Sequence, residues 1–251
     1  MKREFFLPGR NQCDYDISCI EWPCEKPRAV LPCLHGFAGD KYSAVVHALA
    51  RRMQSERVRV LTFDWPGHGN SPVCGDCLSV DNCLADLETV LRYADADGLP
   101  LWLFATSFGA FLGVNEILRR PELFEKIILR SPALKMPEIF RGFLSDEERA
   151  VLDGGGTVDL GYRRPLRLGA DFYEDLCRHR VFDAPLPAGL PGLVIQGDRD
   201  EIVDPRDAAA YAEKNGLRLH LVRGADHRYR GPGQPEEIVD TAAAFLLGGE
   251  T

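Results

Sequence analysis

Short apolar runs alternate with amphipathic stretches along most of the chain. The apolar runs are typical of buried strands and lie at Ala29–Leu34, Val58–Phe63, Leu101–Ala105, Lys126–Leu129, Leu193–Gln196 and Leu217–Val222. The stretches between them repeat apolar residues at helical spacing and predict helices at Tyr42–Ser55, Val80–Ala94, Phe108–Arg119, Pro205–Asn215 and Pro235–Leu247. Because such alternation is built by right-handed crossovers, it predicts an α/β fold with a mostly parallel sheet covered on both faces.

The beginning of the chain extends this sheet. The runs Glu4–Leu7 and Tyr15–Glu21 are separated by a turn at Gly9–Asn11, and we expect them to form an antiparallel edge of an eight-stranded sheet. Pro32 fits poorly in the middle of Ala29–Leu34, because proline removes a donor from the strand ladder. A bulge or an early strand end is expected there.

The alternation breaks over residues 133–190. This stretch is rich in glycine and proline and contains only two short helical patterns, Ser145–Leu152 and Asp171–Arg178. The first opens with a Ser145 cap and has Glu148 three residues later, as in a capping box. We interpret the stretch as an inserted lid or cap. The proposed organisation is one α/β core of residues 1–132 and 191–251 with the lid at 133–190.

Length and charge narrow the classes of function. A chain of 251 residues, 45% of them hydrophobic, suits one large domain with an insertion. Thirty Lys and Arg against 38 Asp and Glu give a formal charge of -8, which makes nucleic acid a poor partner. The first apolar run is too short for a secretory signal, and no run reaches membrane-spanning length. We therefore expect a cytoplasmic protein without a membrane partner.

Cysteine usage adds no metal or redox chemistry. Eight cysteines in a chain of this length are typical of reduced thiols. Cys74 and Cys77 have a spacing found in zinc and redox sites, but a zinc site needs a second pair and a redox motif should open a helix after a strand. We expect a surface loop with two incidental thiols.

One segment predicts a nucleophile. Leu101–Ala110 is an apolar strand that enters a turn of small residues and then a helix, which is the setting of a nucleophile elbow with Ser107 at its strained position. Ala105 stands where glycine is usual and keeps that position small. On this segment alone, a serine that merely caps the helix is an equally good interpretation.

A second segment predicts an oxyanion hole. Residues 34–39 directly follow the Ala29–Leu34 strand, and loops after strands supply backbone N–H groups at the same sheet edge as Ser107. We assign the two donors to Phe37 and Phe108. His35 precedes a glycine turn, and we expect a structural hydrogen-bonding residue beside the substrate rather than a base.

The base and its acid follow the last two strands. His227 comes after Leu217–Val222, while Asp198, Asp200 and Asp204 come after Leu193–Gln196. The order serine, acid, histidine, each beyond a strand end, is that of a Ser-His-Asp triad on an α/β sheet. Asp198 comes too soon after the strand, and Asp204 precedes a proline and suits a helix cap. Asp200 is left as the acid.

These motifs carry a resemblance over nearly the whole chain. His-Gly-Phe, Asp-x-x-Gly-His-Gly-x-Ser, the Ser107 elbow, Gly-x-x-Asp and Gly-Ala-Asp-His resemble the α/β-hydrolase superfamily. The lid length and the run Leu168–Tyr173 resemble bacterial cinnamoyl and feruloyl esterases, with serine aminopeptidase-like and monoacylglycerol lipase-like hydrolases as neighbours. This chain departs from those esterases at Ala105, at Thr106, where histidine is frequent, and at Phe108, where glutamine or methionine is common.

The resemblance implies a serine hydrolase that cleaves small aryl or short-to-medium acyl esters through an acyl-enzyme, without metal or cofactor. Its partner is then a small-molecule ester, and the sequence leaves the oligomeric state open. Phe172 and Tyr173, with Phe140 and Phe143, are candidates to floor an acyl or aryl pocket, although ordinary lid packing explains each equally well.

Two rival functions stay open at this point. A peptidase that removes N-terminal residues would need lid carboxylates such as Glu147, Glu148 or Glu174 to converge on a free amine, but a solvated helix face is the simpler explanation for them. A non-catalytic binding module is the other rival, since fold does not fix function. The intact set of nucleophile, acid and base speaks against it.

Overall fold

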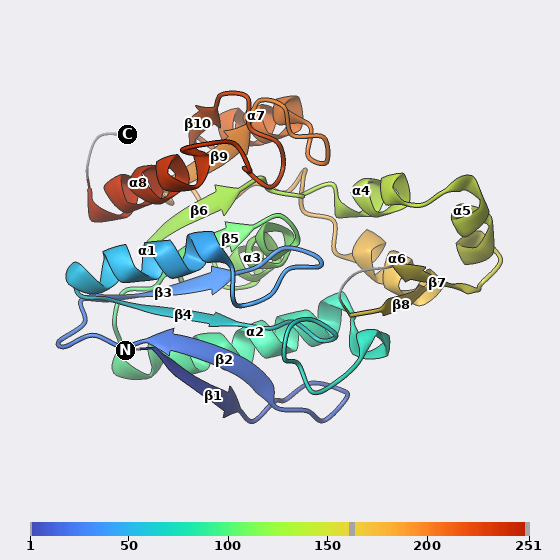
Figure 1. Cartoon of the computed structure of the whole chain (residues 1–251), viewed down its shortest axis with the longest axis horizontal. Helices are drawn as coiled ribbons and strands as arrows, with labels where there is room; N and C mark the ends of the chain where they lie inside the picture. Colours follow the sequence, from blue (N-terminus) through green and yellow to red (C-terminus); the bar gives the residue numbers. More distant parts are fainter. Residues whose placement is uncertain (1, 161–163, 249–251) are drawn as a thin grey trace.

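The computed structural model describes residues 2–160 and 164–248 and confirms the α/β fold. Its main sheet has eight strands in the order β1-β2-β4-β3-β5-β6-β9-β10 (Figure 1). β2 pairs antiparallel with β1 and β4, and every other neighbouring pair is parallel. The strands are β1 (Arg3–Leu7), β2 (Ile17–Trp22), β3 (Ala29–Leu34), β4 (Val58–Phe63), β5 (Trp102–Thr106), β6 (Lys126–Arg130), β9 (Gly192–Gly197) and β10 (Arg218–Val222).

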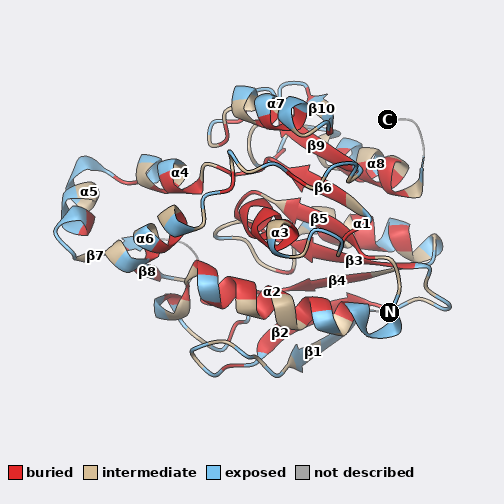
Figure 2. Cartoon of the chain, turned by 180° about the vertical axis from the view of Figure 1, so that it is seen from behind, coloured by how far each residue is buried: buried red, intermediate tan, exposed pale blue. Residues whose placement is uncertain are grey.

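Helices cover both faces of the sheet, each over its own apolar cluster. One face carries α1 (Ala44–Ser55) and α8 (Gln234–Leu247), and the other carries α2 (Val80–Ala94), α3 (Phe108–Arg119) and α7 (Pro205–Lys214). The central strands are buried on both sides (Figure 2), which explains why they read as continuous apolar runs. No described helix is both long enough and apolar enough to cross a membrane.

Pro32 is accommodated within a regular strand. β3 continues to Leu34, and the pairs Val30–Leu101 and Cys33–Phe104 keep one register with β5 on either side of the proline. The N–H of Val30 donates to the carbonyl oxygen of Pro100, just before β5. Because residues two apart in a strand direct their N–H groups to the same side, the N–H that Pro32 lacks would also point toward β5. The expected bulge or early strand end is therefore wrong, and the proline costs only one ladder bond on one side.

The segment between β6 and β9 forms a separate group of elements that projects beyond the carboxyl ends of the parallel strands (Figure 1). It holds α4 (Met136–Phe143), α5 (Asp146–Asp153), the antiparallel pair β7 (Thr157–Leu160) and β8 (Leu166–Gly169), and α6 (Ala170–Arg178). The sequence pattern missed α4 and the hairpin. The capping box of α5, formed by Ser145 and Glu148, is confirmed. Residues 161–163 of the proposed lid lie outside the described residues.

One arginine ties this segment to the core. The guanidinium of Arg164 donates to the carbonyl oxygens of Gly69, Ser71 and Val73 at 3.2, 2.6 and 2.8 Å. These residues belong to the turn after β4, so the hairpin is held against that turn by hydrogen bonds to its backbone.

All eight cysteines are free thiols. Cys74 is exposed, and Cys77 ends a short 3-10 turn at Gly75–Cys77. The amide of Asn82 donates to the sulfur of Cys13 and to the carbonyl of Cys77, so both cysteines border the start of α2.

Candidate active site

Ser107 occupies a strained turn between β5 and α3. Its backbone has φ 53° and ψ -117°, a conformation that costs energy for any residue with a side chain. The turn is fixed because the Ser107 N–H donates to the Arg130 carbonyl at 2.9 Å and the Ser107 carbonyl accepts from Ala110 at 2.9 Å. The Ser107 side chain makes no capping hydrogen bond to α3, so the helix-cap interpretation is wrong.

Small residues let other backbone segments approach this turn. A Cβ atom on Gly109 would lie 2.6 Å from the carbonyl oxygen of His35, so only glycine fits at the start of α3. A Cβ on Gly36 would lie 3.0 Å from the Cβ of Ser107. The loop after β3 therefore passes directly beside the serine.

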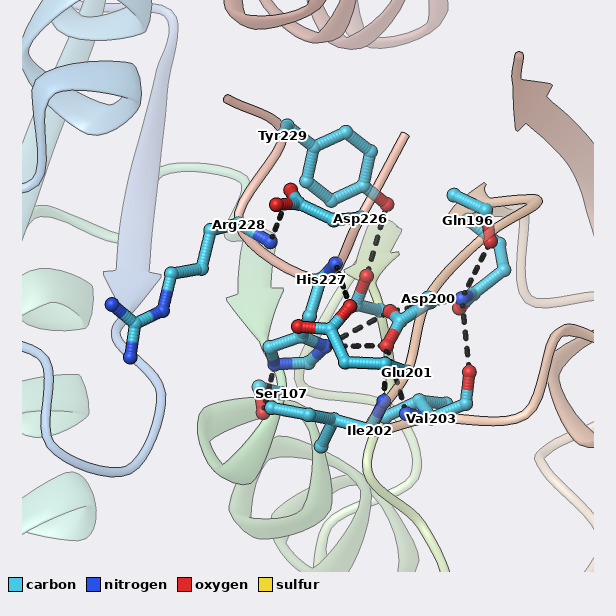
Figure 3. A network of polar contacts seen from close by, with 12 residues as sticks. Ser107, Gln196, Asp200, Glu201, Ile202, Val203, Asp226, His227, Arg228 and Tyr229 are labelled. Atoms are coloured by element: carbon cyan, nitrogen blue, oxygen red, sulfur yellow. Dashed lines mark hydrogen bonds and ion pairs between the residues drawn. The ribbon is translucent and has the colours of Figure 1, made fainter. Parts of the chain in front are cut away.

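His227 and Asp200 complete a hydrogen-bonded chain to this serine (Figure 3). The Nε2 atom of His227, in the loop after β10, lies 3.1 Å from the Oγ atom of Ser107. Its Nδ1 atom lies 3.0 and 2.9 Å from the two carboxylate oxygens of Asp200, in the loop after β9. A proton on Nδ1 leaves Nε2 with the lone pair that a base needs.

Asp200 is held as an anion. It is buried, yet its Oδ1 atom accepts from the N–H groups of Ile202 and Val203 at 2.9 and 2.8 Å, and its Oδ2 atom accepts from the Gln196 amide at 3.0 Å. Burial alone would raise the pKa of this carboxyl group, but hydrogen bonds from His227 and from the two backbone N–H groups outweigh it and lower the pKa.

The two competing carboxylates lie elsewhere. Asp198 is exposed and accepts from the N–H of Gly224 at 2.6 Å. Asp204 caps α7 by accepting from the N–H of Arg206, as the following proline predicts. Of the three candidates considered from the sequence, the structure brings only Asp200 to the imidazole.

Phe37 and Phe108 flank the serine from two directions. Phe108 is the first residue of α3, so its N–H is among the donors that have no partner within the helix, at the end where the helix dipole favours negative charge. Phe37 lies in the loop after β3, and its ring meets that of Phe108 edge to face at 5.9 Å. The role of the Phe37 and Phe108 N–H groups as oxyanion donors stays a prediction.

His35 and His68 are buried and fix the backbone around the site. Nδ1 of His35 donates to the carbonyl of Gly36 at 2.8 Å, and its Nε2 accepts from the N–H of Trp65 at 3.2 Å. Nε2 of His68 accepts from the N–H of Ala38 at 3.1 Å. Burial lowers the pKa of both rings, that of His68 to about 3, so both are neutral. Although His35 borders the cleft, its ring nitrogens are used to hold loops.

A buried ion pair joins the loop after β3, which contains Lys41, to the turn after β4, which begins at Asp64. Lys41 and Asp64 are both almost fully inaccessible, and the ammonium group of Lys41 pairs with Oδ2 of Asp64. Asp64 also accepts from the N–H of Lys41 and from that of Asn70, each at 2.8 Å. Sequence reasoning missed this pair, although Asp64 opens the Asp-x-x-Gly-His-Gly motif.

Ser107 and His227 line a cleft of about 540 Å³. This volume suits a small organic ligand. Three residues of α4, Met136, Ile139 and Phe143, form an apolar part of its wall. Met136 and Ile139 were not singled out from the sequence, because α4 itself was not predicted.

Phe140, Phe172 and Tyr173 pack against one another behind this wall. Phe172 is buried, with its ring 6.4 Å from that of Phe37 and 5.3 Å from that of Phe140. Tyr173 stacks on Phe140 and lies under the guanidinium of Arg141. In the part of the chain that the structure describes, these three rings are not among the residues that line the cleft.

One group of potential metal ligands occurs in residues 2–160 and 164–248, formed by Asp81, Asp175 and His179. Asp175 accepts from the N–H of Val80 at 2.6 Å and pairs with Arg178. It therefore caps the start of α2, and none of the group lines the cleft beside Ser107.

A serine on a strand-to-helix elbow, hydrogen-bonded to a histidine and a buried aspartate at the carboxyl edge of a mostly parallel eight-stranded sheet, defines an α/β-hydrolase. The chain belongs to the serine aminopeptidase S33 family, whose model matches residues 25–152, about half of the chain. The matched region includes Ser107 and ends before Asp200 and His227.

Comparisons with individual proteins agree with this class. The chain is 26% identical to the human monoglyceride lipase over 244 residues, covering 84% of this chain and 79% of the lipase. It is 24% identical to a monoglyceride lipase homologue of monkeypox virus, covering 85% of this chain and 87% of the viral protein.

Solved structures share the fold. A putative hydrolase from Agrobacterium vitis S4 superimposes with a TM-score of 0.83 at 21% identity, covering 98% of both chains. Est1E from Butyrivibrio proteoclasticus, solved with bound ferulic acid, gives a TM-score of 0.82 at 20% identity, covering 97% of this chain and 98% of Est1E.

Proposed function

We propose that this protein hydrolyses carboxylic esters through an acyl-enzyme formed on Ser107. The observation that carries the proposal is the continuous hydrogen-bonded chain from Asp200 through His227 to the Oγ atom of Ser107, which opens into a cleft. A serine hydroxyl is a weak nucleophile near neutral pH, and this chain supplies the base that it needs.

In acylation, Oγ of Ser107 attacks the ester carbonyl carbon while its proton passes to Nε2 of His227. The carbonyl oxygen becomes an oxyanion that receives hydrogen bonds from the N–H groups of Phe37 and Phe108. Asp200 stabilises the imidazolium. The carbon–oxygen bond to the alcohol then breaks, and the leaving oxygen takes the proton from His227.

In deacylation, a water molecule gives a proton to Nε2 of His227 and its oxygen attacks the acyl carbon. The bond to Oγ breaks, the proton returns to Ser107, and the free acid leaves. These steps need neither a metal nor an organic cofactor.

The lining of the cleft favours an ester over a peptide with a free N-terminus. In the described part of the chain, Asp40 is the one acidic residue of the cleft wall. Glu147, Glu148 and Glu174 do not line it, and Glu148 is used in the capping box of α5. A free ammonium group would find little to pair with there.

The apolar wall from α4 supports an aryl or a short-to-medium acyl group as the bound moiety. The ferulic acid bound to Est1E and the similarity to monoglyceride lipases are compatible with ester substrates of these two kinds. A monoacylglycerol is therefore the second substrate class for the same chemistry. We further propose that residues 133–190 act as a lid, because α4 stands over the serine.

A fluorophosphonate probe tests the nucleophile. We expect the wild-type protein to be labelled, Ser107→Ala to lose both labelling and ester turnover, and the control Ser55→Ala on α1 to retain both. A side-by-side panel of aryl esters, short acyl esters, a monoacylglycerol and aminoacyl amides then ranks the substrate classes. Undiminished labelling of Ser107→Ala would show that another residue is the nucleophile, and absence of any labelling or turnover would favour a binding module.

A further inference from the structure

Arg130 is a buried cation in the wall of the cleft that the proposed reaction does not use. It ends β6 and is 8% exposed, and it lines the same cleft as Ser107 and His227. Its carbonyl oxygen accepts from the N–H of Ser107 at 2.9 Å, so it is the residue beside the nucleophile on the neighbouring strand.

The charge of this guanidinium is not neutralised by an ion pair. No carboxylate in residues 2–160 and 164–248 forms a salt bridge with it, and its Nε atom is buried without a hydrogen-bond partner. Asp200 and Asp226 act on the guanidinium from beyond salt-bridge distance, and both already have partners: Asp200 is hydrogen-bonded to His227, and Asp226 is paired with Arg230. Burial lowers the pKa of Arg130, but a guanidinium remains charged at neutral pH.

The Arg130 side chain is held in place by an aromatic ring. Its guanidinium lies 4.6 Å from the centre of the Tyr229 ring. The Tyr229 hydroxyl donates to the Ile195 carbonyl at 3.2 Å and lies 2.9 Å from the Ser131 hydroxyl, so the ring itself is fixed. Stacking orients the planar guanidinium but supplies no negative charge. An ordered, desolvated guanidinium without a direct ion pair is suited to a carboxylate or a phosphate.

The cleft receives residues from both faces of the sheet. Met136 belongs to the apolar cluster on the α2 and α3 face, whereas Val46 and the Tyr229 ring under Arg130 belong to the cluster on the α1 and α8 face. Ser107 lies at the sheet edge between these two sides. The cleft beside Ser107 is therefore apolar on the α4 side and carries the Arg130 cation on the other side.

We infer that Arg130 binds an anionic group, a carboxylate or a phosphate, carried by the substrate on one side of the scissile bond. This inference rests on the proposed ester hydrolysis and names the substrate class within it. Arg228 also lines the cleft, but it is exposed and its side chain extends away from Ser107 and His227 (Figure 3), so it is the matched control.

The turnover test uses ester pairs in which one member carries an additional carboxylate group. One pair is para-nitrophenyl pentanoate and mono-para-nitrophenyl glutarate, with the charge on the acyl side; the other is phenyl acetate and its meta-carboxylate, with the charge on the alcohol side. In one of the pairs, we expect Arg130→Met to lower the anionic-to-neutral ratio of kcat/KM by about ten- to a hundredfold, the range of a charge-assisted hydrogen bond. Arg130→Lys should give an anionic-to-neutral ratio between those of the wild type and Arg130→Met, because it keeps the positive charge. Arg228→Met should change this ratio less than about fivefold.

A titration reports binding without turnover. Glutarate and phenyl phosphate, titrated calorimetrically into the wild-type protein, distinguish a carboxylate from a phosphate site, and binding of the preferred anion should weaken by the same factor in Arg130→Met.

Each outcome decides the inference. If Arg130→Met lowers kcat/KM equally for charged and neutral esters, Arg130 is only a positioning or structural residue and the inference is overturned. A larger change of the ratio from Arg228→Met also overturns it. If the wild-type protein cleaves no ester, the proposed function fails, and the titration alone decides whether Arg130 binds an anion: equal affinities of wild type and Arg130→Met reject it.

Discussion

Replacing Asp200 by asparagine tests the hydrogen-bonded chain at its origin, because the change keeps the size of the side chain and exchanges one oxygen for an NH₂ group. Oδ1 accepts from two backbone N–H groups, those of Ile202 and Val203, so the amide oxygen must take that position. The new NH₂ group then faces Nδ1 of His227 and the amide of Gln196. His227 must accept at Nδ1 and carry its proton at Nε2, where it cannot take the proton of Ser107.

The size of the effect follows from this tautomer change. In other Ser-His-Asp triads the corresponding loss is about ten-thousand-fold in kcat, which corresponds to about 5.4 kcal/mol of transition-state stabilisation. We expect Asp200→Asn to approach this loss. The NH₂ group introduced by the substitution and the NH₂ group of Gln196 would also face each other as donors, which costs about 1–3 kcal/mol of folding stability.

Steady-state kinetics with a chromogenic ester measure the loss, with circular dichroism and urea unfolding to show that the variants are folded. Asp198→Asn is the matched control, since it makes the same chemical change at an exposed carboxylate that accepts a hydrogen bond from the N–H of Gly224. We expect it to lower kcat less than about tenfold, as for a surface hydrogen bond. A larger loss from Asp198→Asn, or an Asp200→Asn enzyme that keeps most of its kcat, would refute the reasoning.

Three further predictions follow from single contacts. Phe143→Ala should change the preference between aryl and alkyl esters more than Tyr173→Ala does, because only Phe143 lines the cleft, and a substrate panel decides between them. Burial raises the pKa of Asp86 to about 7. Between about pH 4 and 7 the folded state therefore keeps the carboxyl proton of Asp86, whereas the unfolded state loses it. The free energy of unfolding falls by up to about 4 kcal/mol as the pH rises over this range. Urea unfolding at pH 5 and pH 7.5 should show the part of this loss between these pH values, about 2.7 kcal/mol, in the wild type but not in Asp86→Asn. An equal pH dependence of the unfolding free energy in the two proteins would contradict it. Lys41→Met should cost about 3–5 kcal/mol of stability by leaving Asp64 buried and unpaired, whereas an unchanged urea midpoint would show that the pair contributes nothing.

The sequence alone determined the sheet, the crossover helices and the order of the site residues. These features are encoded locally: a doubly covered strand must be continuously apolar, and α2 and α3 begin and end where the helical spacing predicts. The choice of Asp200 over Asp204 was also local, because a proline after an aspartate predicts a helix cap. The roles of Ser107, Asp200 and His227 in catalysis stay predictions that the kinetics above will test.

Only the tertiary structure decided what surrounds the serine. The hairpin strand Thr157–Leu160 alternates exposed and buried residues, but four residues are too few to distinguish a strand from a loop by pattern. Whether Phe143 or Phe172 faces the cleft depends on how the insertion packs on the core, and both are aromatic residues in short helices. Arg130 shows the same limit most clearly. An arginine at the end of an apolar strand gives no sign in the sequence that it is buried beside the nucleophile without a direct ion pair. Burial and pairing are set by residues such as Tyr229 that lie far away in the sequence.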